Sequence, residues 1–240
     1  MITSATVNKL NAWEVNKYAI QLYKKYFTQI IIIGCADSIF TLLFNLQTKP
    51  SSIHNTNITP VLFSIYIILP LISVLLEIIL LWFLDQREQG VTLSIVTSFQ
   101  QVLPRFIYVV VAQFFVTLIV SAGLFLLIIP GLIWGLMFSQ VETFLILKKQ
   151  RVREAFTSSK QITKGNLWLI ARSYLILYLP LIILYFLFDY VVIPKTMPSF
   201  ELIFSFIWGL FTSQWGILIT YCIWRSLIKD SASLSTSVTQ

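Results

Sequence analysis

Residues 106–147 read FIYVVVAQFFVTLIVSAGLFLLIIPGLIWGLMFSQVETFLIL, and this stretch decides the fold of the chain. Its 42 residues carry a single charged side chain, Glu142. As one helix the stretch would be about 63 Å long, roughly twice the hydrocarbon thickness of a bilayer. We therefore predict two membrane-spanning helices, 106–129 and 131–147. They turn at Ile129-Pro130-Gly131, because proline removes a hydrogen-bond donor and glycine permits a sharp turn.

The composition of the whole chain agrees with a membrane protein. Hydrophobic residues make up 57% of its 240 residues and charged residues 11%, against ~45–50% and ~25% in soluble domains. These few charges could not cover the surface of a soluble domain of this size, so that class is excluded. Runs of about 20 apolar residues predict an all-α polytopic membrane protein with a single domain, 1–240. Its six spans lie at about 27–46, 60–84, 106–129, 131–147, 167–193 and 202–224.

Three shorter segments, at about 10–26, 91–103 and 151–164, have one apolar and one polar face at helical spacing. In the first of them Val15, Ala19 and Leu22 share the apolar face. Each segment comes directly before an odd-numbered span, so the chain reads as three units of a surface helix and two spans. Whether these units are a true internal repeat stays open. The helices could brace the bundle, and their basic residues also suit anionic lipid headgroups.

The basic residues of the short connections predict the orientation. One side of the membrane takes fourteen of them and the other takes two, Lys49 and Lys195. Because cytoplasmic loops are enriched in Lys and Arg, we predict a multi-pass protein of the cytoplasmic membrane with both termini in the cytoplasm. The fourteen are Lys9, Lys17, Lys24, Lys25, Arg87, Arg105, Lys148, Lys149, Arg151, Arg153, Lys160, Lys164, Arg225 and Lys229.

Residues for common enzymatic chemistry are scarce. The one histidine, His54, lies in a polar loop, where it cannot complete a zinc site or a catalytic triad with groups in the spans. Cys35 and Cys222 lie in separate apolar runs and read as small core residues. No phosphate-binding glycine loop is present. The sequence therefore predicts a protein without a catalytic, metal or cofactor site and without a nucleic-acid partner.

Four ionisable residues fall inside the expected spans: Asp37, Glu77, Glu142 and Arg172. A charge within a bilayer costs roughly 2.5–3.5 kcal/mol on insertion scales, which makes each a candidate functional residue. Glu77, Glu142 and Arg172 lie at similar depths, about 9–11 Å from the cytoplasmic ends of their spans. We predict a buried Glu142–Arg172 pair, with Glu77 as the alternative partner of Arg172. A substrate or proton pathway and hydrated side chains near the inner surface stay open as alternatives.

Small residues recur at every fourth position of the fourth span. Such spacing lets membrane helices approach closely. Glu142 falls within the same face, so we expect it to point into the bundle. This predicted packing stripe comprises Gly131, Gly135, Ser139 and Thr143.

Two segments carry a resemblance to a known family. They are Ile129-Pro130-Gly131 followed by Glu142, and REAFTSSKQITKGNLW at 153–168. The segment from Trp13 to Phe27 resembles the same family's opening surface helix. Together they resemble the bacterial membrane domain of glycerophosphoryl diester phosphodiesterases and the related YciC-like proteins. That resemblance implies a six-span domain of the bacterial inner membrane, without the soluble barrel that performs the phosphodiesterase chemistry.

Two functional hypotheses follow. The first is a non-enzymatic integral membrane protein that assists or organises membrane or lipid components. Its partners would be the bilayer and anionic headgroups, and a membrane-protein partner stays open. The second is a small secondary transporter for an amphiphile or ion that uses the buried acids; the lack of clear inverted repeats speaks against it.

Overall fold

The computed structural model describes residues 11–48, 60–92, 94–188 and 198–237, and in these ranges it contains helices and no strands. The all-α class expected from the sequence is confirmed. His54, Lys49 and Lys195 lie outside the described residues. The helices are α1 (Ala12–Lys25), α2 (Phe27–Thr48), α3 (Pro60–Glu88), α4 (Ile95–Val102), the short 3₁₀ helix η2 (Leu103–Arg105), α5 (Phe106–Leu126), α6 (Ile128–Phe138), α7 (Val141–Leu147), α8 (Val152–Thr163), α9 (Leu167–Leu187) and α10 (Pro198–Ser237).

Five helical stretches in the described ranges are long and apolar enough to cross a membrane, as in a multi-pass membrane protein. The apolar stretch that opens α2, Phe27–Ile39, is shorter than these five. The five are Ile67–Glu88, Ile95–Leu126, Ile128–Leu147, Leu167–Leu187 and Phe206–Lys229.

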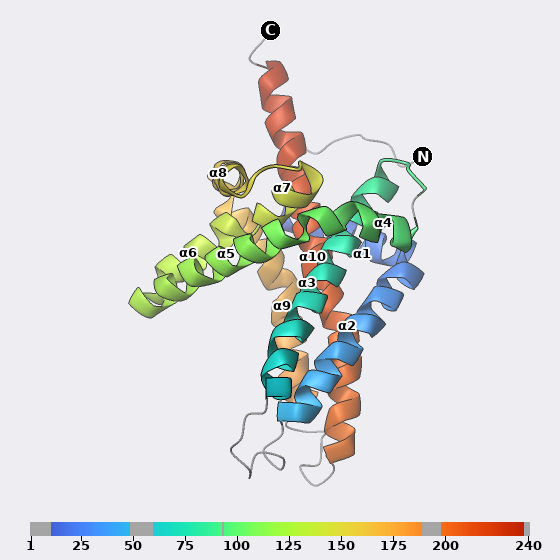
Figure 1. The fold of residues 1–240 in the computed structure, drawn as a ribbon. Coiled ribbons are helices and arrows are strands. Elements are labelled where there is room, and N and C mark those ends of the chain that lie inside the picture. The colour runs from blue at the N-terminus through green and yellow to red at the C-terminus, as the bar shows by residue number, and fades with distance from the viewer. Residues whose placement is uncertain (1–10, 49–59, 93, 189–197, 238–240) are drawn as a thin grey trace.

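The helices form a long bundle with a platform at one end (Figure 1). Helices α2, α3, α9 and α10 run along the bundle. Helices α1, α4, α7 and α8 gather around one of its ends, and these four helices are the platform. Helices α5 and α6 lie antiparallel beside each other and project from that end at a steep angle to α3 and α10. The last turns of α10 extend beyond the platform.

The hairpin between the third and fourth apolar segments turns earlier than expected. Leu127 alone separates α5 from α6, with extended backbone at φ −159° and ψ 138°. Pro130 lies in the first turn of α6, where the backbone N–H groups have no partner within the helix and proline loses nothing. The turn is tight because two glycines meet there: a Cβ added at Gly123 would lie 2.7 Å from the Cα of Gly131.

The fourth apolar segment is broken, where the sequence predicts one span over 131–147. Helix α6 ends at Phe138 and α7 begins at Val141. The break leaves the main-chain carbonyl of Met137 without a partner in its own helix. The hydroxyl of Ser159 on α8 donates to this carbonyl at 2.7 Å, and the hydroxyl of Thr163, which donates to the carbonyl of Ser159 at 2.8 Å, lies 3.2 Å from the Met137 oxygen. With Ala155 they form a fully buried face of small side chains at every fourth residue of α8.

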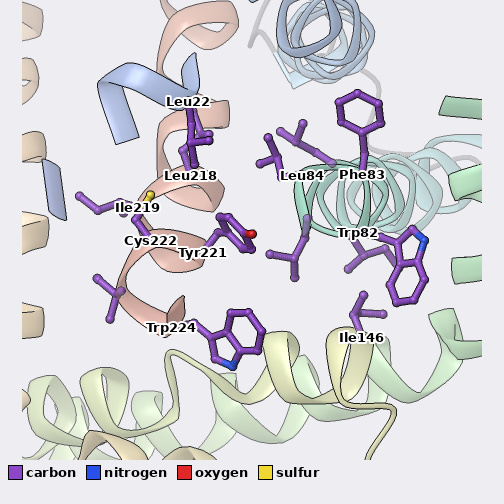
Figure 2. Packing of buried hydrophobic residues seen from close by; sticks show 14 of the residues in the cluster. Leu22, Trp82, Phe83, Leu84, Ile146, Leu218, Ile219, Tyr221, Cys222 and Trp224 are labelled. Carbon is purple, nitrogen blue, oxygen red and sulfur yellow. The ribbon is translucent and has the colours of Figure 1, made fainter. Parts of the chain in front are cut away.

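The core lies where the platform meets the bundle (Figure 2). Every residue from Ile78 to Leu84 on α3 is buried, so this part of α3 is surrounded on all sides. Leu22 of α1, Ile146 of α7 and the segment Leu218–Trp224 of α10 pack around it. This packing fixes α3, α7 and α10 relative to one another and thereby positions Glu77 on α3 and Glu142 on α7.

Candidate functional site

A cavity of about 500 Å³ lies between α3, α7, α9 and α10. Its wall combines two carboxylic acids with five hydroxyl groups, a glycine and two aliphatic side chains. Among the described residues, no basic side chain lines it. The lining residues are Glu77, Leu81, Glu142, Thr143, Tyr174, Tyr178, Thr212, Gly216, Ile217 and Thr220.

Helical spacing brings most of this wall together. Thr212, Gly216 and Thr220 follow one another at every fourth position of α10 and therefore share one face. Tyr174 and Tyr178 do the same on α9, and their rings stack 6.2 Å apart. These spacings are visible in the sequence, which does not show that the two faces meet.

The hydroxyls of α9 and α10 turn acceptor atoms towards the cavity. Thr220 donates to the carbonyl of Gly216 at 2.8 Å, which uses its only proton. The phenol of Tyr174 therefore donates the 2.7 Å hydrogen bond that it shares with Thr220. Thr212 likewise donates to the carbonyl of Trp208 at 2.8 Å. These three hydroxyl oxygens have therefore used their protons and can only accept further hydrogen bonds through their lone pairs.

Glu142 lies between two cavities. Its carboxylate accepts a hydrogen bond from the side-chain amide of Gln113 on α5 at 3.3 Å. Gln113 and Glu142 also line a second cavity of about 220 Å³ between α5, α6 and α7. Sequence analysis missed Gln113, although it is an isolated amide in the apolar run of α5.

The predicted Glu142–Arg172 pair is wrong. In the described part of the chain no ion pair joins Arg172 to Glu142 or to Glu77. The side chain of Arg172 is exposed, and its guanidinium lies 5.5 Å from the centre of the Trp168 ring. Glu142 and Arg172 were predicted to pair because they lie at similar depths along their helices. They do not pair, because Arg172 points away from the bundle on the outer face of α9.

The other predicted residues differ in their positions. Asp37 is buried on α2, close enough to Glu77 for electrostatic repulsion, but it is not among the residues that line the cavity. Of the packing stripe, Gly131 lies against Leu124, while Gly135 leaves an ordinary 3.8 Å contact with Val120. Helix α6 ends before Ser139, so Thr143 belongs to α7 and not to the helix that carries the two glycines.

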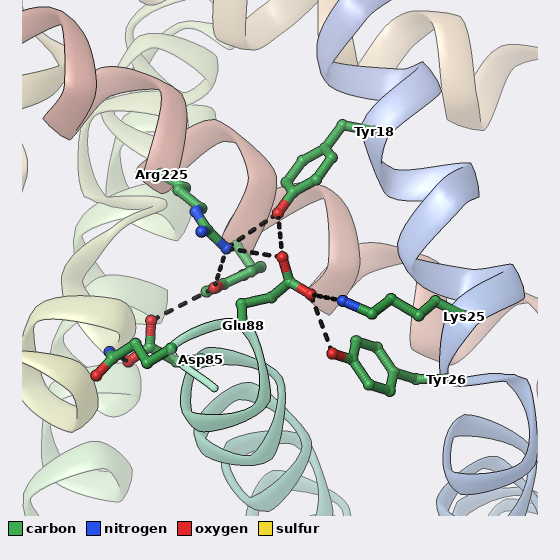
Figure 3. Close-up of polar contacts among 8 residues, drawn as sticks. Tyr18, Lys25, Tyr26, Asp85, Glu88 and Arg225 are labelled. Carbon is green, nitrogen blue, oxygen red and sulfur yellow. Dashed lines mark hydrogen bonds and ion pairs between the residues drawn. The ribbon is translucent and has the colours of Figure 1, made fainter. Parts of the chain in front are cut away.

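A second polar cluster lies in the platform and joins α1, α3 and α10 (Figure 3). The carboxylate of Glu88, 11% exposed, accepts from Lys25 Nζ at 2.6 Å and from Arg225 Nη1 at 3.1 Å. It also accepts from the phenols of Tyr18 at 2.8 Å and Tyr26 at 3.0 Å. Sequence analysis did not identify this cluster; its only signal was an acid and several bases at the ends of apolar runs.

Glu88 also changes the acidity of the α1 side chains around it. Its hydrogen bond to Lys25 raises the pKa of that ammonium group above its usual value. Burial and the hydrogen bond to Glu88 raise the pKa of Tyr18. The cluster therefore keeps these groups protonated and holds three helices together, which is a structural role.

No protein-family model, curated protein or solved structure matches this chain. Conclusions about function therefore depend on the residues and their arrangement. In the described ranges no three His, Cys, Asp or Glu side chains come together as metal ligands.

Proposed function

We propose that this chain is a non-enzymatic, six-span protein of the bacterial inner membrane that organises anionic lipids at the cytoplasmic surface. The proposal adds α2 as the sixth span and places the platform and both termini in the cytoplasm. The resemblance to the phosphodiesterase membrane domain and YciC-like proteins supports the same proposal.

One observation carries the proposal: the outward face of α8 is basic. Its inward face of Ala155, Ser159 and Thr163 is used in packing against the broken segment. The exposed positions of α8 and its two cap residues then include four basic side chains and one acid: Arg151, Arg153, Lys160, Lys164 and Glu154. Basic side chains beside a membrane surface attract anionic headgroups, by about 1 kcal/mol each.

The preceding loop adds two further cations that are held in place. Lys148 Nζ lies 5.7 Å from the centre of the Trp224 ring, and Lys149 Nζ lies 5.5 Å from that of Trp82. These cation–π contacts limit the movement of both ammonium groups. A fixed group of cations beside α8 suits recognition of phosphate-bearing headgroups.

The test compares the protein in nanodiscs of phosphatidylglycerol and of phosphatidylcholine. We expect phosphatidylglycerol to raise the thermal unfolding temperature, and a triple variant, Arg153→Gln, Lys160→Gln and Lys164→Gln, to lose most of that gain. A control variant, Lys17→Gln with Lys24→Gln, removes exposed charges of α1 and should keep it. An equal gain for wild type and triple variant would refute the role of α8.

A second candidate function, secondary transport of an ion or amphiphile, is favoured by the cavity that Glu77 and Glu142 share. Proton-dependent uptake into reconstituted vesicles tests it. Uptake that is lost in Glu77→Gln would favour transport over a role confined to lipid organisation.

A further inference from the structure

We propose that the cavity between α3, α7, α9 and α10 binds an organic ammonium group. The inference concerns a binding site and holds whether or not the bound molecule is transported. It depends on the two carboxyl groups of the wall, on a buried hydroxyl without a partner among the described residues and on the size of the cavity.

The wall carries two carboxyl groups and, among the described residues, no basic side chain to pair with them. Glu77 forms no hydrogen bond or ion pair with the described residues, and Glu142 receives only the amide of Gln113. The one basic residue of the neighbouring span segment, Arg172, points outward to Trp168. An uncompensated carboxylate inside a bundle is costly, and a bound cation would remove that cost.

A separate observation on α7 points to a ligand. Thr143 lines the cavity and is fully buried, yet its hydroxyl has no hydrogen-bond partner in the described structure. Buried hydroxyl groups nearly always have a partner. Thr143 belongs to the wall, and its hydroxyl would gain a partner from a polar group placed in the cavity.

The remaining wall selects the kind of cation. About 500 Å³ is within the size range of small-molecule sites and too large to enclose a bare metal ion. The hydroxyl oxygens of Tyr174, Thr212 and Thr220 offer lone pairs, which accept from N–H groups. The tyrosine rings also attract a cation. Leu81 and Ile217 can contact the apolar part of the same molecule.

An ammonium group could come from a free amine or from the headgroup of phosphatidylethanolamine. The first arm of the test therefore uses nanodiscs of phosphatidylglycerol with added butylammonium, and 1-butanol as its uncharged counterpart. The second arm replaces part of the phosphatidylglycerol by phosphatidylethanolamine. Thermal unfolding over a range of concentrations gives the apparent affinity in each arm.

We expect butylammonium, but not 1-butanol, to raise the unfolding temperature of the wild type. Glu77→Gln should weaken this binding at least about tenfold, because an ammonium–carboxylate contact is lost. Thr143→Val should weaken it about 3- to 10-fold, the effect of one hydrogen bond. Thr143→Val keeps the shape of the side chain and removes an unpaired polar group, so it should fold at least as well as the wild type.

Thr157→Val on the exposed face of α8 is the matched control and should bind like the wild type. Stabilisation by phosphatidylethanolamine alone, lost in the same two variants, would assign the ammonium group to a lipid headgroup and support the site. Two results would overturn the proposal. One is an equal response to butylammonium and 1-butanol without such stabilisation by phosphatidylethanolamine, and the other is unchanged affinity for the stabilising molecule in both Glu77→Gln and Thr143→Val.

Discussion

The hydroxyl of Ser159 on α8 donates a 2.7 Å hydrogen bond to the main-chain carbonyl of Met137, two residues before the break in the fourth apolar segment. The hydroxyl of Thr163 donates to the carbonyl of Ser159 at 2.8 Å and also lies 3.2 Å from the Met137 oxygen. A surface helix thus satisfies a backbone group that the broken helix leaves free. The break in turn directs Glu142 and Thr143 of α7 towards the cavity.

Removal of both hydroxyls should destabilise the protein more than removal of either. Ser159→Ala should cost about 1 kcal/mol, since the hydroxyl of Thr163, 3.2 Å from the Met137 oxygen, can then turn its proton to that carbonyl. The double variant with Thr163→Val should cost about 2–3 kcal/mol because the buried carbonyl then has no partner. Chemical denaturation in detergent measures both, and Thr157→Ala on the exposed face should change stability by less than about 0.5 kcal/mol. A double variant no less stable than Ser159→Ala would contradict this account.

Gly131→Ala should destabilise the α5–α6 hairpin, whereas Gly135→Ala should be close to neutral. The added Cβ at position 131 would lie 2.6 Å from the backbone nitrogen of Leu124, which cannot move without shifting α5. At position 135 the nearest atom, Val120 Cγ2, is 3.8 Å away, an ordinary contact. We expect a loss of about 1–3 kcal/mol for the first variant. Thermal unfolding of both in the same detergent compares them, and equal melting temperatures would show that the glycine contact is unimportant.

Stability should fall in alkaline solution as the Glu88 cluster loses protons. The pKa values of Lys25 and Tyr18 are raised in the folded protein. Their contribution is therefore complete below the unfolded-state values, about pH 10, and is lost as the pH rises through the higher folded-state values. Glu88→Gln should flatten this decline, because Glu88 is the main cause of the shift at Lys25. Unfolding temperatures between about pH 9 and pH 12 measure the slope. The exposed Lys24→Gln should retain the wild-type slope, and the same slope in Glu88→Gln would exclude the cluster as its source.

Cysteine labelling should place α8 in the cytoplasm. In a background with Cys35→Ala and Cys222→Ala, Ser158→Cys should react with a membrane-impermeant maleimide only after the cells are opened. Ser52→Cys, which lies outside the described residues, should react in intact cells. The excess of Lys and Arg on one side predicts this orientation. Labelling of position 158 in intact cells would reverse the topology.

The sequence by itself determined that this chain is an all-α membrane protein, because composition and the length of apolar runs reflect the bilayer rather than the neighbouring helices. It also placed a hairpin within 106–147 and identified Glu77 and Glu142 as residues that need a polar environment. It missed the position of the turn by three residues, because proline fits the first turn of α6 as well as it fits a connection.

Only the tertiary structure decided which side chains meet. The sequence gives the depth of Glu142 and Arg172 along their helices, but their contacts also depend on how each helix is rotated and which helix lies beside it. Packing turns Arg172 outward to Trp168 and brings Gln113 to Glu142. It also joins the Tyr174 face of α9 to the Thr220 face of α10 and thereby forms the cavity. Helix rotation is fixed by many weak contacts over the whole core, and no local pattern in the sequence records their sum.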